Sequence, residues 1–310
     1  MKKNLWVKLI SVILIVVFVC TFASCDLIGI GDESGSDSNV DVIVNEGGYT
    51  GVKAEDLTPS ADLTFTMASD KKGYQLKSAT KCKDEQVVIP STYTGADGVT
   101  LPVTNIAAGA FKNSKTVVSV YIPDSVTKIT GGVSGAFMGA KSLTTVVCGS
   151  GLVEIGNKTF ENCSQLKSIV LQSGLKKIGS YAFAGCESLE SIVIPDTVET
   201  IGEACFQRCS KMKSVTLGKG IQSQDTMDAN GNLIMKKDGK PKKNVDEIGK
   251  FAFYFCKDIE TIKYNGTIEE FQRLHLDVSC FLSVTLTKVV QCSDGTCELP
   301  KLEGQNEFEV

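Results

Sequence analysis

Three observations predict a solenoid, in which short coils of chain stack into one continuous core. Phenylalanine recurs at 111, 137, 160, 183, 206 and 253, so the basic spacing is 23 residues, with three extra before 137 and one extra in the double step to 253. Isoleucine precedes each copy, at 106, 129, 155, 178, 201 and 248. A short β-prone run begins about nine residues after each Phe. Self-similarity at a fixed period of about 20–50 residues is typical of stacked repeats.

Within each coil, the residue pattern predicts one short strand. The run Ser-apolar-X-apolar should direct two side chains inward, such as Ile169 and Leu171, because alternate strand residues face opposite sides. The Ile, the Phe, the residue three after the Phe and the Leu six after it should fill the rest of the interior. One coil cannot bury these groups alone, so stacking is required.

The first 24 residues read as an export signal. Lys2, Lys3 and Lys8 precede an uncharged run from Leu9 to Cys25, which is short for a membrane span. The sequence Phe22-Ala23-Ser24-Cys25 resembles a bacterial lipobox, which implies cleavage after residue 24 and lipidation of Cys25. The alternative is an ordinary secretory signal with an incidental cysteine. Lipidation would hold the chain on a membrane.

The sequence predicts five parts of the chain, of which the export signal at residues 1–24 is the first. Residues 25–58 are expected to be an acidic, glycine- and serine-containing tether. Residues 59–103 should form an N-terminal β cap, in which 63–67 can pair with 73–76. The repeats occupy 104–264, and 265–310 should be a C-terminal cap. Residues 222–245 interrupt the repeats, and Asn230-Gly231 within them predicts an inserted β-hairpin.

The coil Ile178-Gly179…Phe183-Ala184-Gly185-Cys186…Leu189…Ile192-Val193-Ile194-Pro195 resembles the BspA-like leucine-rich repeats of bacteria. The likeness extends, with substitutions, from about Ile106 to Tyr264. It implies an α/β leucine-rich-repeat solenoid: a curved stack of coils with a parallel β-sheet on the concave side and short helical or irregular turns on the convex side. The family's characterised members are surface proteins, and several take part in adhesion.

The cysteines fall into two groups with different expected roles. Cys163, Cys186, Cys209 and Cys256 all stand three residues after a repeat Phe, where the first two copies have Ser114 and Ala140. A position that accepts Ser and Ala calls for a small buried side chain, so free buried thiols are expected. Their spacing matches no zinc motif, and we expect no metal site.

Cys292 and Cys297 flank Asp294-Gly295, which favours a two-residue hairpin turn. Such a turn would make the two cysteines a close, non-hydrogen-bonded pair, which suits a disulfide in an exported protein. An anaerobic habitat would leave the pair reduced.

The outward positions at the centre of the strands form the candidate binding surface: Tyr121, Val147, Val170, Val193, Thr216 and Lys263. A row of solvent-facing valines can receive a partner, although β-branched residues also simply suit strands. A second candidate is the lysine group of the insertion: Lys236, Lys237, Lys240, Lys242 and Lys243. These could meet an acidic partner or a polysaccharide, or merely solvate a hairpin.

Composition argues against several other functions. The formal charge is −4 and only two of 32 basic residues are arginine, which gives no reason to expect a nucleic acid. His275 is the single histidine, and no phosphate loop, GxSxG, HExxH or supported Cys–His pair occurs, so no catalysis and no cofactor are expected. We therefore predict a lipid-anchored, surface-exposed protein that binds a protein or glycan. The alternatives are an architectural envelope spacer and a polysaccharide-binding module.

Overall fold

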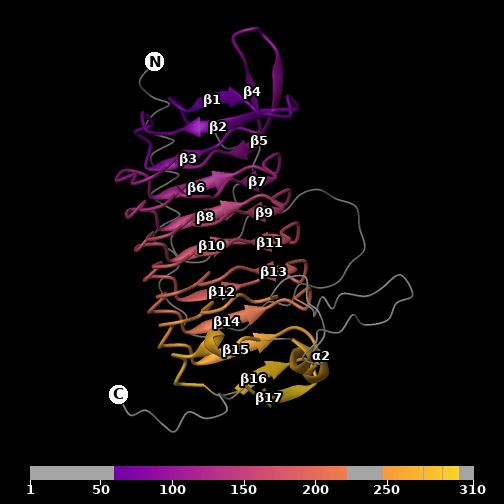
Figure 1. Cartoon of the computed structure of the whole chain (residues 1–310). Helices are drawn as coiled ribbons and strands as arrows, with labels where there is room; N and C mark the ends of the chain where they lie inside the picture. The colour runs from indigo at the N-terminus through magenta and orange to yellow at the C-terminus, as the bar shows by residue number, and fades with distance from the viewer. Residues whose placement is uncertain (1–58, 222–246, 275, 288, 300–310) are drawn as a thin grey trace, which may run out of the picture. The chain divides into compact units, whose positions relative to one another are not determined.

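The protein is described by a computed structural model that places residues 59–221, 247–274, 276–287 and 289–299. All of them belong to one compact unit, Asp41–Val310, and the core cluster of buried side chains lies within it, from Leu76 to Val290. The unit is a β-solenoid of the leucine-rich-repeat type with almost no helix (Figure 1). Two columns of strands run along the stack: one of strands of three or four residues, and one that begins with the seven-residue β5 and continues with two-residue strands.

The longer strands form the long-strand column, in which neighbouring strands are parallel. It contains β3 (Gln86–Val88), β6 (Ser119–Ile122), β8 (Thr145–Cys148), β10 (Ser168–Val170), β12 (Ser191–Val193), β14 (Ser214–Leu217), β15 (Thr261–Tyr264) and β16 (Val289–Cys292). The hydrogen-bonded pairing is continuous from β3 to β10 and again from β12 to β16, which divides the column into two sheets. The sequence predicted the six strands from β6 to β15, but not that β3 and β16 continue the column, and not the division.

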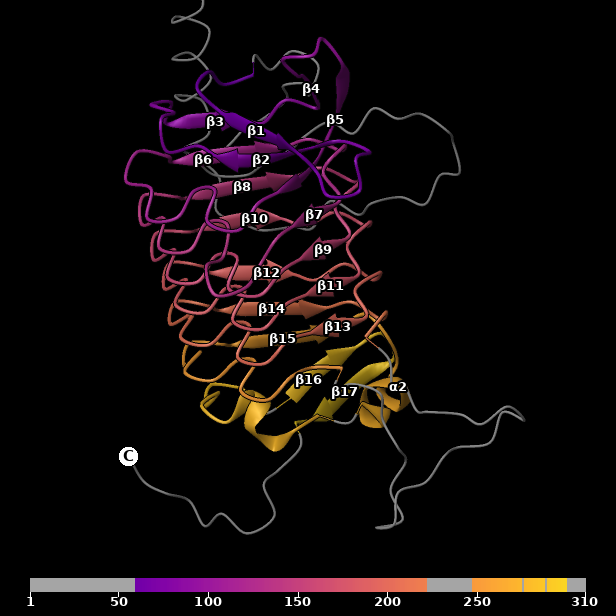
Figure 2. The same ribbon diagram turned by 45° about the horizontal axis from the view of Figure 1, so that its top comes forward.

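The second column, the short-strand column, is a feature that the sequence analysis did not predict. Its members are β5 (Thr100–Ile106), β7 (Lys128–Ile129), β9 (Glu154–Ile155), β11 (Lys177–Ile178) and β13 (Thr200–Ile201). Each ends on the repeat isoleucine, and these isoleucines pair in register along the stack. Figure 2 shows the two columns side by side. β7, β9, β11 and β13 have two residues each, too few for a period-2 pattern, which is why the sequence shows only the isoleucine.

The turn that joins the short-strand column to the next long strand contains the repeat Phe, and we call it the ridge. Its rings stack from coil to coil with centroids 4.5–5.2 Å apart and planes within 15° of parallel. The ridge backbone is also bonded between coils: Phe160 N–H donates to Ala182 O and Phe183 N–H to Cys205 O, at 2.7 and 2.8 Å. Coils are therefore held to their neighbours on three sides, except between β10 and β12, where the long-strand pairing is interrupted.

The ridge also has residues in the left-handed backbone region: the position two after the Phe in the six coils from Phe111 to Phe253, and the position two before it in all of these except the coil of Phe137. The position two after the Phe holds Asn113, Gly139, Asn162, Gly185, Arg208 and Phe255, with φ between 56° and 75°. Glycine suits this conformation, and asparagine tolerates it better than most residues. A Cβ on Gly185 would lie 2.5 Å from Asn162 Oδ1. The asparagine of one coil therefore leaves no room for a side chain at the equivalent position of the next coil.

The N-terminal end is closed by strands that run against the stack. β1 (Thr64–Met67) pairs antiparallel with β2 (Tyr74–Ser78), which confirms the predicted pairing of these segments. β2 then pairs parallel with β5, so the short-strand column begins here. β4 (Thr92–Thr94) and β5 form an antiparallel hairpin at the same end.

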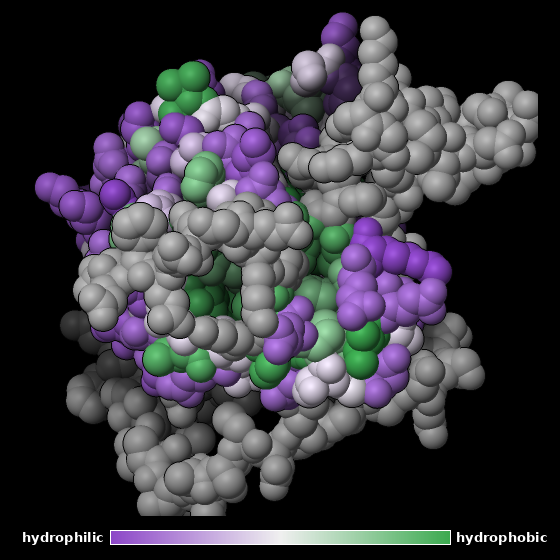
Figure 3. All heavy atoms as spheres, turned by 60° about the horizontal axis from the view of Figure 1, so that its bottom comes forward, coloured by the Kyte–Doolittle hydropathy of each residue, from purple (hydrophilic) through white to green (hydrophobic). Residues whose placement is uncertain are grey.

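At the other end, the stacking continues into residues that the sequence analysis assigned to a cap. Phe281 stacks on Phe253 with centroids 5.0 Å apart, and β16 pairs parallel with β15. This coil was not recognised in the sequence because Phe253 and Phe281 are 28 residues apart, not 23. The helix α2 (Ile268–Arg273) lies between them. β17 (Gly295–Glu298) then turns back antiparallel. Apolar and polar side chains are mixed on the described surface at this end (Figure 3).

Candidate binding face

The structure brings the six predicted outward positions of the long-strand column into one row. Tyr121 pairs with Val147 and Val147 with Val170, while Val193 pairs with Thr216 and Thr216 with Lys263. The register adds Val88 before Tyr121 and Gln291 after Lys263. Val88, Tyr121, Val147 and Val170 pack together apart from the main core, as expected for the opposite face of the sheet.

Exposure along this row is not uniform. In the full-length chain Tyr121 and Val147 are 6% and 1% exposed, whereas Val193 is 62% exposed and Lys263 is also exposed. Val170 and Thr216 are half-buried. Burial, with a smaller contribution from Asp124, raises the pKa of Tyr121 above its usual range. Val88, Tyr121 and Val147 pack against one another in this first part of the row.

The accessible part of the row is therefore C-terminal to the division between β10 and β12. Beside it runs a hydroxyl row, in which Ser191 pairs with Ser214 and Ser214 with Thr261. Ser191 is exposed, and the other two are half-buried. The inward neighbours Ile192, Val215 and Ile262 are all buried, so the backbone that carries this face is fixed by the core.

The cysteine ladder lies in the core, as predicted. Cys163, Cys186, Cys209 and Cys256 are free and fully buried. Each thiol donates to the carbonyl of a repeat Phe in the preceding coil, at 3.0–3.3 Å. Burial raises the pKa of Cys163 to about 12, and it raises those of Cys186 and Cys209 well above their usual range. These protonated thiols are suited to packing and not to nucleophilic chemistry.

The hairpin of β16 and β17 has a different register from the predicted one. Cys292 pairs with Gly295 and Cys297 with Val290, so the turn is Ser293-Asp294, one residue earlier than expected. Contacts with the chain before α2 fix it there: Ser293 N–H donates to Gly266 O, and Asp294 Oδ1 accepts from Ile268 N–H. The cysteines are diagonal neighbours with sulfur atoms 3.9 Å apart.

Both cysteines of this hairpin are free and half-buried. Burial, and then the contact with Cys297, raises the pKa of Cys292 to about 12. A disulfide between them stays a prediction.

Several predicted features lie outside the described residues. These are Cys25, the tether, the 222–245 hairpin and its five lysines.

Within the described part of the chain, no group of three or more His, Cys, Asp or Glu is placed to hold a metal ion. The same residues contain no helix that is long and apolar enough to cross a membrane.

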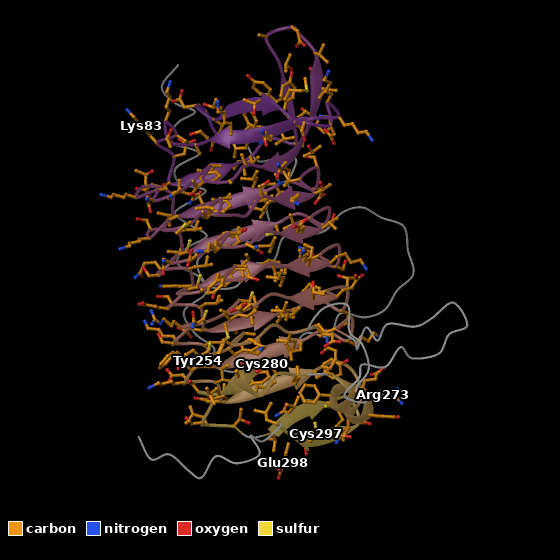
Figure 4. All side chains as sticks on the ribbon, in the orientation of Figure 1. Lys83, Tyr254, Arg273, Cys280, Cys297 and Glu298 are labelled. Atoms are coloured by element: carbon orange, nitrogen blue, oxygen red, sulfur yellow. The ribbon has the colours of Figure 1, made fainter. Side chains whose placement is uncertain are left out.

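The ridge carries an aromatic group that was not predicted from the sequence. Phe251, Tyr254 and Phe255 surround the core residue Phe253, and both Phe251 and Phe255 are 37% exposed. The signal was the run Phe-Ala-Phe-Tyr-Phe at 251–255, in which one Phe was assigned to the repeat and the others were not explained. Figure 4 places Tyr254 across the view from Arg273 of α2.

The stacked coils, the parallel long-strand column and the buried repeat positions define a leucine-rich-repeat β-solenoid. The family model described as BspA type Leucine rich repeat region (6 copies) matches residues 133–227 and 235–296, about half of the chain. The chain belongs to this family. None of the curated proteins matches it.

Solved structures of bacterial repeat proteins have the same kind of fold. The Leucine Rich Repeat protein of T. pallidum (TpLRR) is 29% identical with a TM-score of 0.51, and the match covers 65% of this chain and 90% of that one. A leucine rich cell surface protein of Faecalibacterium prausnitzii is 24% identical, with a TM-score of 0.45 and coverages of 68% and 55%. A leucine-rich repeat protein of Bacteroides ovatus is 22% identical, with a TM-score of 0.43 and coverages of 77% and 71%.

Proposed function

We propose that this chain is a lipid-anchored protein of the bacterial cell surface that binds a protein ligand, in the manner of an adhesin, without catalysis. The observation that carries the proposal is the accessible part of the outward row, where Val193, Thr216 and Lys263 stand in register on a rigid sheet. Membership of the BspA-type family and the lipobox-like sequence at Cys25 support the surface location.

The chemistry of this face suits a protein ligand. Val193 offers an apolar contact that is 62% exposed, and Lys263 offers a cation two strands further on. The hydroxyl row beside them can donate and accept hydrogen bonds. An apolar centre with a polar surround is the usual composition of a protein interface.

Rigidity is the mechanistic advantage of the fold. The backbone of β12, β14 and β15 is fixed by the buried side chains Ile192, Val215 and Ile262, so little order has to be gained on binding. Preorganisation of this kind raises affinity by lowering the entropy cost of association. We place this face on the concave side of the stack, where a ligand would contact several coils at once.

The test measures binding of Asp41–Val310 to immobilised fibronectin, laminin and collagen by surface plasmon resonance. We expect saturable binding to at least one of them, and Val193→Glu should weaken it at least about tenfold, because a charge would be buried against the ligand. Val133→Glu is the matched control, since Val133 is 93% exposed but lies outside the long-strand column. Absence of saturable binding to every protein would favour the architectural spacer.

The anchor has its own test. A fatty-acid probe should label the wild-type chain when it is expressed in a bacterium with a lipoprotein pathway, and Cys25→Ala should abolish the label. Equal labelling of the two chains would contradict lipidation and favour an ordinary secretory signal.

A further inference from the structure

The hairpin of β16 and β17 holds its two cysteines in an arrangement that does not suit a disulfide. Cys292 lies opposite Gly295, and Cys297 lies opposite Val290, so the cysteines are diagonal neighbours on one face. In a regular ladder such neighbours have Cα atoms about 7–8 Å apart, whereas a disulfide needs about 4.4–6.8 Å. The Sγ atoms nevertheless lie 3.9 Å apart. Oxidation of the pair therefore requires the two strands to move relative to each other.

The turn of this hairpin is not the turn that its local sequence favours. Two-residue hairpins prefer turns whose central residues have positive φ, and Asp-Gly is a preferred pair for them. Here the central residues are Ser293 and Asp294, and neither has a positive φ. The pair Asp294-Gly295 lies across the end of the turn instead. Local backbone preference therefore favours a turn one residue further along the chain.

A turn at Asp294-Gly295 would place the two cysteines directly opposite each other. Each residue of β16 would then pair with a residue two positions further along the chain, Cys292 with Cys297 and Val290 with Leu299. A slip of two positions keeps every side chain on its own face, because the faces alternate residue by residue. Leu299 already packs against the core, as both cysteines do. The cysteines would form a non-hydrogen-bonded pair with Cα atoms about 4.5 Å apart, which suits a disulfide.

Contacts with the start of α2 hold the hairpin in its present register. Ser293 N–H donates to Gly266 O at 2.9 Å, and Ile268 N–H donates to Asp294 Oδ1 at 2.8 Å. Gly295 lies against the same helix, since a Cβ built on it would be 3.2 Å from Ile268 Cδ1. Figures 1 and 2 both show β17 beside α2, and Figure 4 labels Cys297 at this end of the stack. Tertiary contacts therefore favour one register, whereas the turn preference and a disulfide favour the other.

We propose that Cys292 and Cys297 form a reversible redox switch, in which oxidation to a disulfide moves the hairpin to the Asp294-Gly295 turn and releases its contacts with α2. The other cysteines in the described part of the chain are buried, so this pair is the accessible one. The switch lies at the end of the stack and does not rest on the proposed binding face.

The oxidant is a low-molecular-weight disulfide. One cysteine thiolate attacks it, which forms a mixed disulfide and releases one small thiol. The thiolate of the other cysteine then attacks the protein sulfur of the mixed disulfide and releases the second small thiol. Two electrons pass from the cysteines to the small disulfide, and the two cysteine protons end on the released thiols.

The experiment treats Asp41–Val310 with excess glutathione disulfide at about pH 8, where more of an accessible thiol is ionised. Peptide mapping by mass spectrometry should find a disulfide between residues 292 and 297 that dithiothreitol reverses. Hydrogen exchange followed by NMR should show the Ile268 amide exchanging at least about tenfold faster after oxidation, because a first-turn N–H has no acceptor within the helix. Glu270 N–H donates to Thr267 Oγ1 at 3.2 Å inside the helix cap, so its exchange should not change.

Two variants separate the change of register from other effects of the oxidant. Cys297→Ser keeps the hairpin but cannot form the disulfide, so exchange at Ile268 should be the same with and without oxidant. Asp294→Asn should form the disulfide faster than the wild type, because Asn-Gly also prefers the shifted turn. The proposal is overturned if no disulfide forms within the chain, if it forms while exchange at Ile268 stays unchanged, or if Cys297→Ser responds to the oxidant as the wild type does.

Discussion

In the six coils from Phe111 to Phe253, the interior position always holds phenylalanine, whereas two residues later the ridge holds Asn, Gly, Arg or Phe. Both positions return with the same spacing. The interior position fixes a side chain, because each ring must fill the space between two others. The ridge position fixes only a backbone conformation, with φ between 56° and 75°. Periodicity in this chain therefore has two causes. Where only the backbone conformation is constrained, the side chain can differ from coil to coil.

The largest expected effect comes from removing one interior ring. Phe183 is fully buried between Phe160 and Phe206, with ring centroids 5.2 Å away on both sides. Phe183→Ala should lower the free energy of unfolding by about 3–5 kcal/mol, from lost burial and the cavity that remains. Urea unfolding of Asp41–Val310 followed by circular dichroism measures this. The matched ridge variant Phe255→Ala should change stability by less than about 1 kcal/mol, and equal losses would remove the distinction between interior and ridge.

A glycine on the ridge should show the next effect. Gly185 has φ of 75°, and an added Cβ would lie 2.5 Å from Asn162 Oδ1. Gly185→Ala should therefore cost about 2 kcal/mol, from backbone strain and displacement of the asparagine. Gly98 has φ of 80° with open space around it, so Gly98→Ala isolates the strain and should cost about 1 kcal/mol. If Gly185→Ala costs no more than Gly98→Ala, the Asn162 contact does not constrain the ridge.

The buried thiols predict a loss of stability in alkali. The pKa of Cys163 is about 12 in the folded chain, against an ordinary value of 9.0. Its stabilising contribution is complete below pH 9 and is lost as the pH rises toward 12, because the unfolded chain releases the proton first. At pH 10 the loss from this thiol is about 1.4 kcal/mol. Cys163→Ser should lose less stability than wild type between pH 8 and pH 10; an identical loss would contradict the assignment.

The smallest effect is expected when a ridge residue is exchanged between coils. Asn162→Phe places at φ of 61° the residue type found at position 255, and it should cost about 1 kcal/mol. The thermal midpoint of Asp41–Val310 measures it, with Phe255→Asn as the reciprocal exchange that should raise the midpoint. If both exchanges are neutral, the ridge does not discriminate between Asn and Phe.

Much of the fold could be predicted from the phased residues. The Phe and Ile spacing identified the coils, and the outward positions were placed in the correct register within each sheet, from Tyr121 to Val170 and from Val193 to Lys263. The short-strand column was missed because two residues, such as Lys128 and Ile129, carry no alternation. The coil of Phe281 was missed because the insertion of α2 changed the spacing.

The site was less predictable, because exposure depends on contacts that a repeat pattern does not contain. Val147 and Val193 occupy equivalent positions and have the same residue type, yet one is 1% and the other 62% exposed. The register of the cysteine hairpin similarly depended on contacts between Asp294 and Ile268, which are distant in the sequence. The aromatic ridge group was visible as a run of letters, but its outward direction follows from the left-handed turns.

The coil-to-coil bonding of the ridge and the strand columns has a mechanical consequence. Every coil is attached only to the one before and the one after it, so a force that separates the two ends of the stack can detach one coil at a time. A released coil of 23 residues lengthens the chain by about 75–80 Å. Under tension the stack would therefore lengthen in repeated steps of this size, one coil at a time. It would not unfold in a single event.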